Sequence, residues 1–528
     1  MSYTRRSFLG KTSAAAVTLI VPGMAPGMMS GMVSAEEAAT QTAPEKILGG
    51  PEREVVALSA TELSTAIRNK QLSCVEVMQA YLANIDKLNP KFNAIVSTRD
   101  YSQLLKEAQI RDEELSRGDY HGWMHGFPQA VKDLSDSKGL LTSLGSPIFK
   151  DNIANNDSIH VQRIKQSGAI IIGKTNVPEF GLGSQTYNPV FGTTLNAYDG
   201  FSTAGGSSGG AAVALALEML PVADGSDLMG SLRNPAAFNN VIGLRPTPGR
   251  VPLNGMYIEQ LPCNGPMGRN VRDTAMLLST MAGYHSAAPT SLKQDPTVFT
   301  QSLQSNFSGK RIGWLGDFDG YLPMEKGILD VCQQSLQVFR DIGCEVDEAK
   351  LDYPMDQLWE TWLTFRHWLV LGKLEPLYKD PKTRSLLKPE AVWEAEGGLK
   401  LRAQDIYRAS TARSQWYKAL LNAFEQYDFL VLPTAQTFPF DASIHWPKEI
   451  AGRSMDTYHR WMEVVVPGTL SGCPVINVPA GFGKNGLPMG LQIIAPRHAD
   501  LAVLKVAYAY EQASAWNLRP APIFSGGS

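Results

Sequence analysis

Apolar and polar residues follow two different patterns along this chain, short apolar runs and helical spacing. The two patterns alternate from about residue 120 onward. Short apolar runs typical of buried strands occur in GFPQAVKD at 126–133, AIIIG at 169–173 and VIGL at 241–244. Helical spacing occurs between them, in SIHVQRIKQSG at 158–168 and in residues 209–219. The order strand, helix, strand recurs in KRIGWLG, residues 329–339 and CEVDEA. This alternation predicts an α/β fold with a largely parallel or mixed central sheet covered by helices on both faces.

Helices are predicted before this region as well. Ser59 and Ser73 each precede a glutamate by three residues, which is the pattern of a capping box at a helix start. An apolar stripe from Met78 to Leu88 follows the second box and should end at Pro90. Another helix is expected over residues 101–116.

The first 54 residues have a different character. Arg5 and Arg6 precede a short apolar run that Pro22 and Pro26 interrupt, so the run is poorly suited to span a bilayer. Residues 1–35 resemble a twin-arginine export signal, with small residues at 33–35 where cleavage would occur. We therefore expect a signal peptide at 1–35, a flexible segment at 36–54 and a single catalytic domain at 55–528. The expected location is the periplasm or the medium.

Composition excludes several classes of function. Of 528 residues, 44% are hydrophobic and 19% are charged, as in soluble globular proteins, so no stable membrane insertion is expected. The net charge of -3 gives no electrostatic reason to expect nucleic acid as a partner. The five cysteines form no CxxC pair, and His121 and His125 stand among glycines without an HExxH motif. We predict neither a bound metal nor a cofactor.

Two short motifs suggest chemistry that their surroundings argue against. GAIIIGKT at 168–175 fits the phosphate-binding pattern GxxxxGK[ST], but its apolar middle belongs in a strand, where the backbone amides are already paired. GGSSGG at 205–210 fits the nucleophile elbow GxSxG at Ser207 or Ser208, but no strand-like run precedes it. A Ser-His-Asp esterase remains an alternative, although the histidines at 285, 367, 445, 459 and 498 lie in no motif that we recognise.

Three separated segments support another interpretation. Lys132 ends the apolar strand of GFPQAVKD, Ser207 lies in GGSSGG, and Ser231 lies in GSDLMGSLRNPAA. Together with IIGKTNVPEFGLGSQT and VINVPAGFGKNGLPMGLQIIAPRH, they closely resemble the amidase signature family of serine hydrolases. The resemblance extends from about residue 55 to the C-terminus. It implies a mixed sheet flanked by helices and the hydrolysis of carbon–nitrogen amide bonds through an acyl-enzyme.

The resemblance also implies a role for each catalytic residue. Ser231 would attack the carbonyl carbon, Ser207 would pass protons, and Lys132 would be the base. The Gly206–Ser207 peptide bond is expected to be cis, and the glycines around it should permit a close-packed turn. Lys132 must be neutral to act as a base, so burial has to lower its pKa.

The loop before Ser231 is expected to support the reaction. The backbone amides that would form the oxyanion hole belong to Leu228, Met229, Gly230 and Ser231. The family commonly has Thr-Gly-Gly before the serine, so Met229 departs from the pattern, and we expect its side chain to narrow the site. The residues expected to hold the loops in place are Ser208, Asp227 and Arg233.

The substrate is expected to be a small-molecule amide. Aromatic residues gather at 358–370 and 455–468, which predicts either core packing or an aromatic-lined pocket for apolar or aryl amides. Glutamyl-tRNA amidotransferase A subunits share the family, but the export signal favours a stand-alone hydrolase, as a monomer or homodimer. The remaining alternative is a catalytically inactive binding protein on the same scaffold.

Overall fold

The centre of the molecule is an eight-stranded mixed β-sheet. The computed structural model describes residues 51–528 apart from 256, 258–259, 515, 517–518 and 524–528. The strand order is β10-β9-β11-β15-β14-β7-β8-β6. Strand β9 pairs in parallel with β10 and β11, and the other neighbours pair antiparallel. The bounds are β6 Ala223–Asp227, β7 Ile242–Arg245, β8 Cys263–Gly268, β9 Arg311–Trp314, β10 Glu345–Glu348, β11 Phe429–Pro433, β14 Val475–Phe482 and β15 Pro488–Ile494.

A smaller sheet lies beside the first. Strand β3 (Ile170–Thr175) pairs in parallel with β2 (Pro128–Lys132) and antiparallel with β1 (Ile95–Val96). All residues of β2 and β3 are buried. Because GAIIIGKT contributes most of its residues to this buried strand, its amides are not free to cradle a phosphate. Two further pairs of short strands are β4 (Tyr187–Asn188) with β5 (Gly192–Thr193), and β12 (Glu449–Ile450) with β13 (Arg453–Ser454).

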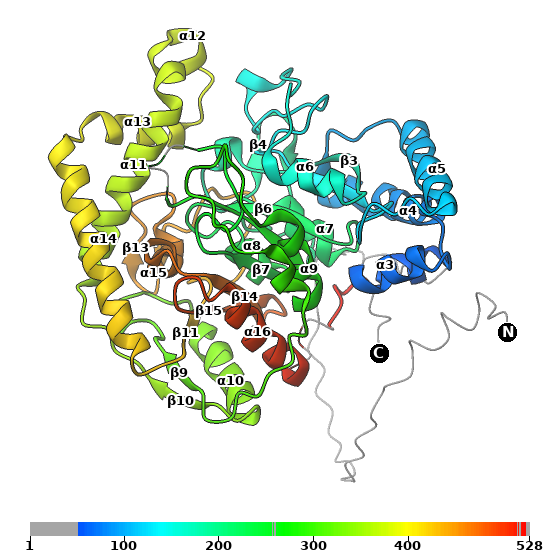
Figure 1. Ribbon diagram of the computed structural model, residues 1–528. Helices are drawn as coiled ribbons and strands as arrows, with labels where there is room; N and C mark the ends of the chain where they lie inside the picture. The colour runs from blue at the N-terminus through cyan, green and yellow to red at the C-terminus, as the bar shows by residue number, and fades with distance from the viewer. Residues whose placement is uncertain (1–50, 256, 258–259, 515, 517–518, 524–528) are drawn as a thin grey trace, which may run out of the picture.

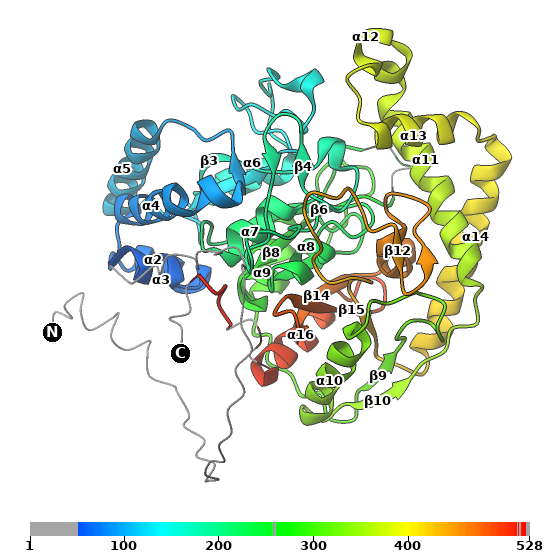
Figure 2. The same cartoon turned by 180° about the vertical axis from the view of Figure 1, so that it is seen from behind.

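Helices flank the main sheet, which confirms the predicted fold class. Helix α16 contacts both α9 and α10, and these three helices pack against β8, β14 and β15, whereas α8 packs with α7 and against β7, β14 and β15. Figures 1 and 2 show helices α3–α5 on one side of the molecule and α11, α13 and α14 on the opposite side. The bounds of the longer helices are α3 Ala60–Arg68, α4 Cys74–Phe92, α5 Tyr101–Arg117, α6 Ile159–Gln166, α7 Gly209–Ala216, α9 Val271–Met281, α10 Ile328–Asp341, α11 Met355–Lys379, α13 Pro389–Leu399, α14 Ala403–Phe424 and α16 Asp500–Ser514. The shorter ones are α2 Pro51–Ala57, α8 Arg233–Phe238, α12 Pro381–Arg384 and α15 Val466–Ser471.

The predicted helix starts are confirmed, but one predicted end is wrong. Both capping boxes form, at Ser59 with Glu62 and at Ser73 with Glu76. Helix α4 continues two residues beyond Pro90 and ends at Phe92. Its C-terminal cap is Asn93, which has a left-handed φ of 50°. The proline removes only its own N–H from the helix, and the Asn93 amide still donates to the Asn89 carbonyl at 2.8 Å.

The predicted N-terminal segments fall largely outside the described residues. The predicted signal at 1–35 lies there entirely, and so does 36–50 of the predicted flexible segment. Residues 51–54, predicted to be flexible, instead begin helix α2. Pro51 suits a first helical position, and Glu52 and Glu54 favour the positive end of the helix dipole. One hydrophobic core cluster runs from Val55 to Ala521. Within the described residues, no helix is both long and apolar enough to cross a membrane.

Candidate active site

Lys132 is buried at the carboxyl end of β2, where the apolar residues before it pair with β3. Its Nζ donates hydrogen bonds to Ser208 Oγ at 2.7 Å, Ser207 Oγ at 2.9 Å and the Ser226 carbonyl at 3.2 Å. Burial lowers the pKa of Lys132 to about 7, against the opposing effect of Asp224 and Asp227. At neutral pH a large share of this amine is therefore uncharged and able to accept a proton.

The glycine-rich segment forms a close-packed turn that carries Ser207. The Gly206–Ser207 peptide bond is cis, as predicted. A Cβ at Gly205, whose φ is 70°, would lie 2.7 Å from Asn234 Oδ1, and one at Gly206 would lie 3.0 Å from the Gln185 amide nitrogen. Glycine is required at both positions because the neighbouring chain approaches too closely for a side chain.

Ser231 follows β6 in a loop whose amides are unusually free. Ser207 and Ser231 line the same cavity, and the Ser208 amide donates to the Ser231 carbonyl at 3.3 Å. Among hydrogen bonds between described residues, none has the amide of residue 228, 229, 230 or 231 as its donor, and none involves the Ser231 hydroxyl. Buried backbone amides are nearly always paired in folded proteins. Four successive free amides beside a serine hydroxyl can therefore receive the negative charge of a tetrahedral intermediate.

A buried ion network holds this loop. Asp227 bonds to Arg233 Nε at 3.1 Å and Arg245 Nη1 at 3.1 Å, and it accepts the Leu232 amide at 3.2 Å. Burial alone would raise the pKa of Asp227, but the two arginines outweigh burial and hold it below its usual value. Arg233 Nη2 also donates to the Met229 carbonyl at 2.7 Å. Asp227, directly before the loop, and Met229, within it, are thus tied to one guanidinium group, which fixes the first half of the loop.

The cavity beside these serines has a wall of mixed polarity, with an apolar part and a polar and charged part. Its volume is about 620 Å³, and helix α11 contributes one face of its wall through Arg366, Leu369, Val370, Lys373, Leu374 and Leu377. Other segments contribute further apolar residues, namely Leu134, Leu144, Phe149, Phe180 and Leu182. They also contribute polar and charged residues, among them Asp136, Asp157, His160 and Asn264. Of the two alternatives predicted for residues 358–370 and 455–468, core packing is the one that the structure shows, and the aromatic-lined pocket is not formed by the described residues. Trp359, Trp362, Phe365 and Trp461 pack in the core instead, because they lie on other parts of the helix surface or on neighbouring segments.

The expectation for the Met229 side chain is also wrong. Met229 is 5% exposed and belongs to the hydrophobic core, whereas the adjacent Leu228 lines the cavity. The contact of the Met229 carbonyl with Arg233 and Thr469 turns this residue inward. The proposed role of its backbone amide is independent of the side chain and stays a prediction.

Met229→Ala should therefore act on stability and not on specificity. Truncating a buried methionine costs about 2–5 kcal/mol of unfolding free energy. Thermal unfolding should report this loss, while relative kcat/KM values across amides of increasing size stay unchanged. A selective gain in kcat/KM for bulky amides would instead indicate that the Met229 side chain lines the cavity.

One histidine that sequence reasoning passed over lies in the cavity wall. His160 is 1% exposed; its Nε2 lies 3.3 Å from Asp224 Oδ2, and its Nδ1 accepts from Asn264 Nδ2 at 3.0 Å. Both ring nitrogens are thus engaged, and in the described part of the chain neither contacts a serine hydroxyl. The contacts that a Ser-His-Asp mechanism needs are not formed here, whereas Lys132 contacts Ser207 directly.

A second missed residue is Arg245. It lies at the end of the otherwise apolar strand β7 and is buried against Asp227 and the Leu261 carbonyl. The signal in the sequence was a charged residue directly after the run VIGL, which a surface strand end also explains.

A buried lysine bonded to a serine, on a mixed α/β scaffold, is the arrangement of a lysine-dependent serine hydrolase. The model of the Amidase family matches residues 76–504. The chain is 32% identical over 467 residues to an acylamidase of Rhodococcus erythropolis, covering 87% of this chain and 96% of the relative. It is 31% identical over 501 residues to the A subunit of the glutamyl-tRNA(Gln) amidotransferase of Thermoanaerobacter pseudethanolicus, with 89% and 99% covered.

Solved structures agree with the sequence relatives. A bacterial aryl acylamidase of the amidase signature family superimposes with a TM-score of 0.83 at 28% identity, covering 90% of this chain and 99% of that chain. The peptide amidase of Stenotrophomonas maltophilia gives a TM-score of 0.74 at 27% identity, with 88% and 98% covered. The chain belongs to the amidase family, and it is a hydrolase that acts on amides.

Proposed function

We propose that this enzyme is a stand-alone amidase that cleaves small apolar or aryl amides, with Ser231 as nucleophile, Ser207 as proton relay and Lys132 as base. The observation that carries the proposal is the contact of the buried Lys132 amine with Ser207, beside Ser231 and the free amides of residues 228–231. The family relationship supports the same assignment of roles.

The reaction then proceeds in two halves. Neutral Lys132 accepts the Ser207 proton as Ser207 accepts the Ser231 proton, and Ser231 Oγ bonds to the carbonyl carbon. The loop amides stabilise the negative oxygen, and the protons return through Ser207 to the leaving nitrogen as the carbon–nitrogen bond breaks. Water then attacks the Ser231 ester by the same proton route and releases the carboxylic acid.

The apolar part of the wall supports the choice of substrate. The leucines, the valine and the two phenylalanines of the cavity offer an apolar surface to an acyl or aryl group, beside polar and charged residues such as Asp136 and Lys373. Relatives described as acylamidase and aryl acylamidase point the same way. Glutamine serves as the charged comparison amide, because it carries an α-amino and an α-carboxylate group that the apolar part of the wall would not accommodate.

A substrate panel combined with a fluorophosphonate probe tests the proposal. Purified enzyme should be labelled at Ser231 and should hydrolyse anilides and aliphatic amides with kcat/KM at least a hundredfold above that for glutamine. No labelling would support the inactive binding protein instead. Efficient release of ammonia from glutamine would overturn the proposed substrate class.

The pH dependence tests the role of Lys132. Its pKa is lowered to about 7, and the catalytic form is the uncharged one. Activity should therefore fall below pH 7, rise through a single limb near pH 7 and stay high into alkaline conditions. The measurement is kcat/KM against pH, which reports the pKa of the free enzyme. An optimum near pH 5 would contradict a lysine base.

Export by the twin-arginine route is the second part of the proposal, supported by Arg5, Arg6 and the apolar run after them. Replacing both arginines with lysine should leave an uncleaved precursor in the cytoplasm. Cell fractionation shows in which compartment the protein lies, and intact-protein mass shows whether the N-terminal segment has been removed. Delivery and cleavage equal to the unaltered chain would contradict this route.

A further inference from the structure

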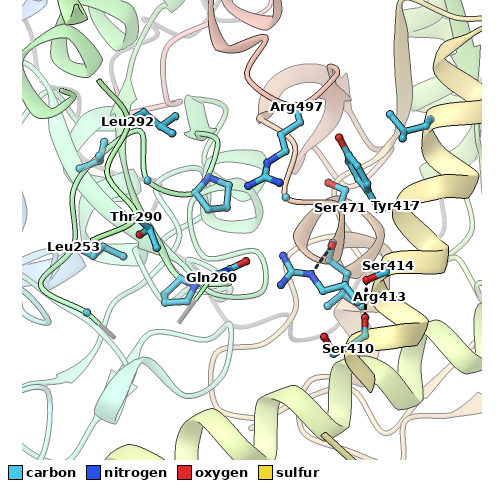
Figure 3. Close-up of a pocket in the computed structure, with 18 of the residues that line it drawn as sticks. Leu253, Gln260, Thr290, Leu292, Ser410, Arg413, Ser414, Tyr417, Ser471 and Arg497 are labelled. Atoms are coloured by element: carbon cyan, nitrogen blue, oxygen red, sulfur yellow. Dashed lines mark hydrogen bonds between the residues drawn. The ribbon is translucent and has the colours of Figure 1, made fainter. Parts of the chain in front are cut away.

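A second cavity lies apart from the catalytic serines, between helix α14, the end of α15 and the loop after β7 (Figure 3). Its volume is about 530 Å³. Helix α14 lines it with residues spaced three, four and seven positions apart, including Ser410, Arg413, Ser414 and Tyr417. Arg497, which follows β15, lines it as well. Among its described lining residues are Arg413, Lys418 and Arg497 and no aspartate or glutamate, so the described part of the wall is positively charged.

The two arginines in this cavity are not neutralised by protein carboxylates. Arg413 Nε donates to the Leu470 carbonyl at 2.9 Å. Within residues 51–528 as described, neither Arg413 nor Arg497 has an acidic group at ion-pair distance. Figure 3 shows both guanidinium groups extending into the cavity from different walls. Burial, together with the charges of Arg245 and Arg497, lowers the pKa of Arg413 to about 10, which still leaves it charged at neutral pH.

Three buried arginines elsewhere in the described structure are paired with carboxylates. Arg233 and Arg245 share Asp227, and Arg366 pairs with Glu394 at 2.9 Å. Holding cations together without a carboxylate is unfavourable, and a bound anion relieves it. The half-buried Arg413 and the exposed Arg497 therefore form a cationic pair that is suited to an external ligand.

We propose that this cavity binds a small organic carboxylate. Two guanidinium groups can hold a carboxylate through parallel N–H···O bonds, and the nearby serine and tyrosine hydroxyls supply further donors. The wall opposite α14 presents the apolar residues Leu253 and Leu292 beside Thr290 and Gln260 (Figure 3), so it can accommodate a hydrocarbon body. The cavity is much larger than an inorganic ion requires.

The site adjoins the catalytic cavity, because Leu253 and Pro262 line both. Amide hydrolysis releases a carboxylic acid, so the reaction generates a ligand of the required class next to this wall. The carboxylate site does not depend on the roles proposed for Ser231, Ser207 and Lys132.

Calorimetric titration with benzoate tests the site on the full chain, before and after fluorophosphonate labelling has blocked the catalytic cavity. The labelled enzyme should bind one benzoate. Arg497→Gln and Arg413→Gln should each raise the Kd at least tenfold. Arg408→Gln, an exposed residue on the same helix outside the cavity, is the matched control and should leave the Kd unchanged. Arg497 makes no described hydrogen bond, so its variant is expected to keep the fold even if Arg413→Gln is unstable.

Three results would overturn the proposal. One is an unchanged benzoate Kd in Arg497→Gln. Another is equally tight binding of benzyl alcohol, which would indicate an apolar cavity without carboxylate recognition. The third is equally tight binding of inorganic phosphate, which would indicate a site for simple oxyanions. If the probe fails to label Ser231, the proposed catalytic role fails, while the arginine dependence of benzoate binding is still measured.

Discussion

Ser231→Ala should lower kcat/KM by about four to six orders of magnitude, since catalytic serines removed from comparable triads cost about a millionfold in kcat. The hydroxyl is the atom that would form the acyl-enzyme, and it belongs to the loop that carries the free amides of residues 228–231. The same change should abolish fluorophosphonate labelling. Steady-state rates and intact-protein mass spectrometry measure the two effects.

The fold should survive this change. The Ser231 hydroxyl makes no described hydrogen bond, so the melting temperature of Ser231→Ala should stay close to that of the unaltered enzyme. Ser335→Ala, a buried serine on α10 outside the cavity, serves as the control for a lost hydroxyl and should retain activity. Labelling that persists in Ser231→Ala would assign the nucleophile to another residue.

Local patterns were sufficient to predict much of the scaffold. Strands β2 and β3 follow from short apolar runs that are buried throughout, and helix α6 follows from apolar positions with a period of 3.6 residues. Helices α11–α14 were not predicted. Helix α14 is largely polar, and its few buried residues, such as Trp416 and Leu420, are covered by segments distant in the sequence, mainly α11 and α15. Amphipathic pattern alone carries little signal in such a helix.

The catalytic constellation could be predicted only through the family resemblance. Lys132 and Ser207 are 75 positions apart, and nothing local to either residue brings them to 2.9 Å. The sequence also could not determine the side-chain directions of Met229 and of the aromatic residues of α11, for a related reason. Type and spacing identify apolar residues, but the neighbouring segments decide which of them face a cavity and which face the core.

Lys132→Met and Ser207→Ala should each lower kcat/KM by several orders of magnitude, and the double variant should lose little more than the worse single one. Methionine retains most of the buried volume of lysine but can neither accept the proton nor donate to Ser207 and Ser208. Because Lys132 and Ser207 would act on the same proton, removing either disables the same step, and their effects cannot multiply. A double-mutant cycle on kcat/KM measures this coupling, with thermal unfolding of each variant as the check on folding.

The decisive comparison is with His160→Gln, which removes the histidine of the cavity wall. If lysine is the base, His160→Gln should retain far more activity than Lys132→Met, and its activity should keep the limb near pH 7. The alternative mechanism makes the opposite prediction, since a histidine base would be indispensable and the lysine would be a supporting group. Strictly multiplicative losses for Lys132→Met and Ser207→Ala would also contradict the relay, because independent groups add in free energy. Non-additive losses for Lys132→Met and Ser207→Ala, together with high activity of His160→Gln, would favour the lysine-dependent mechanism. They would exclude a histidine base and two unrelated structural defects.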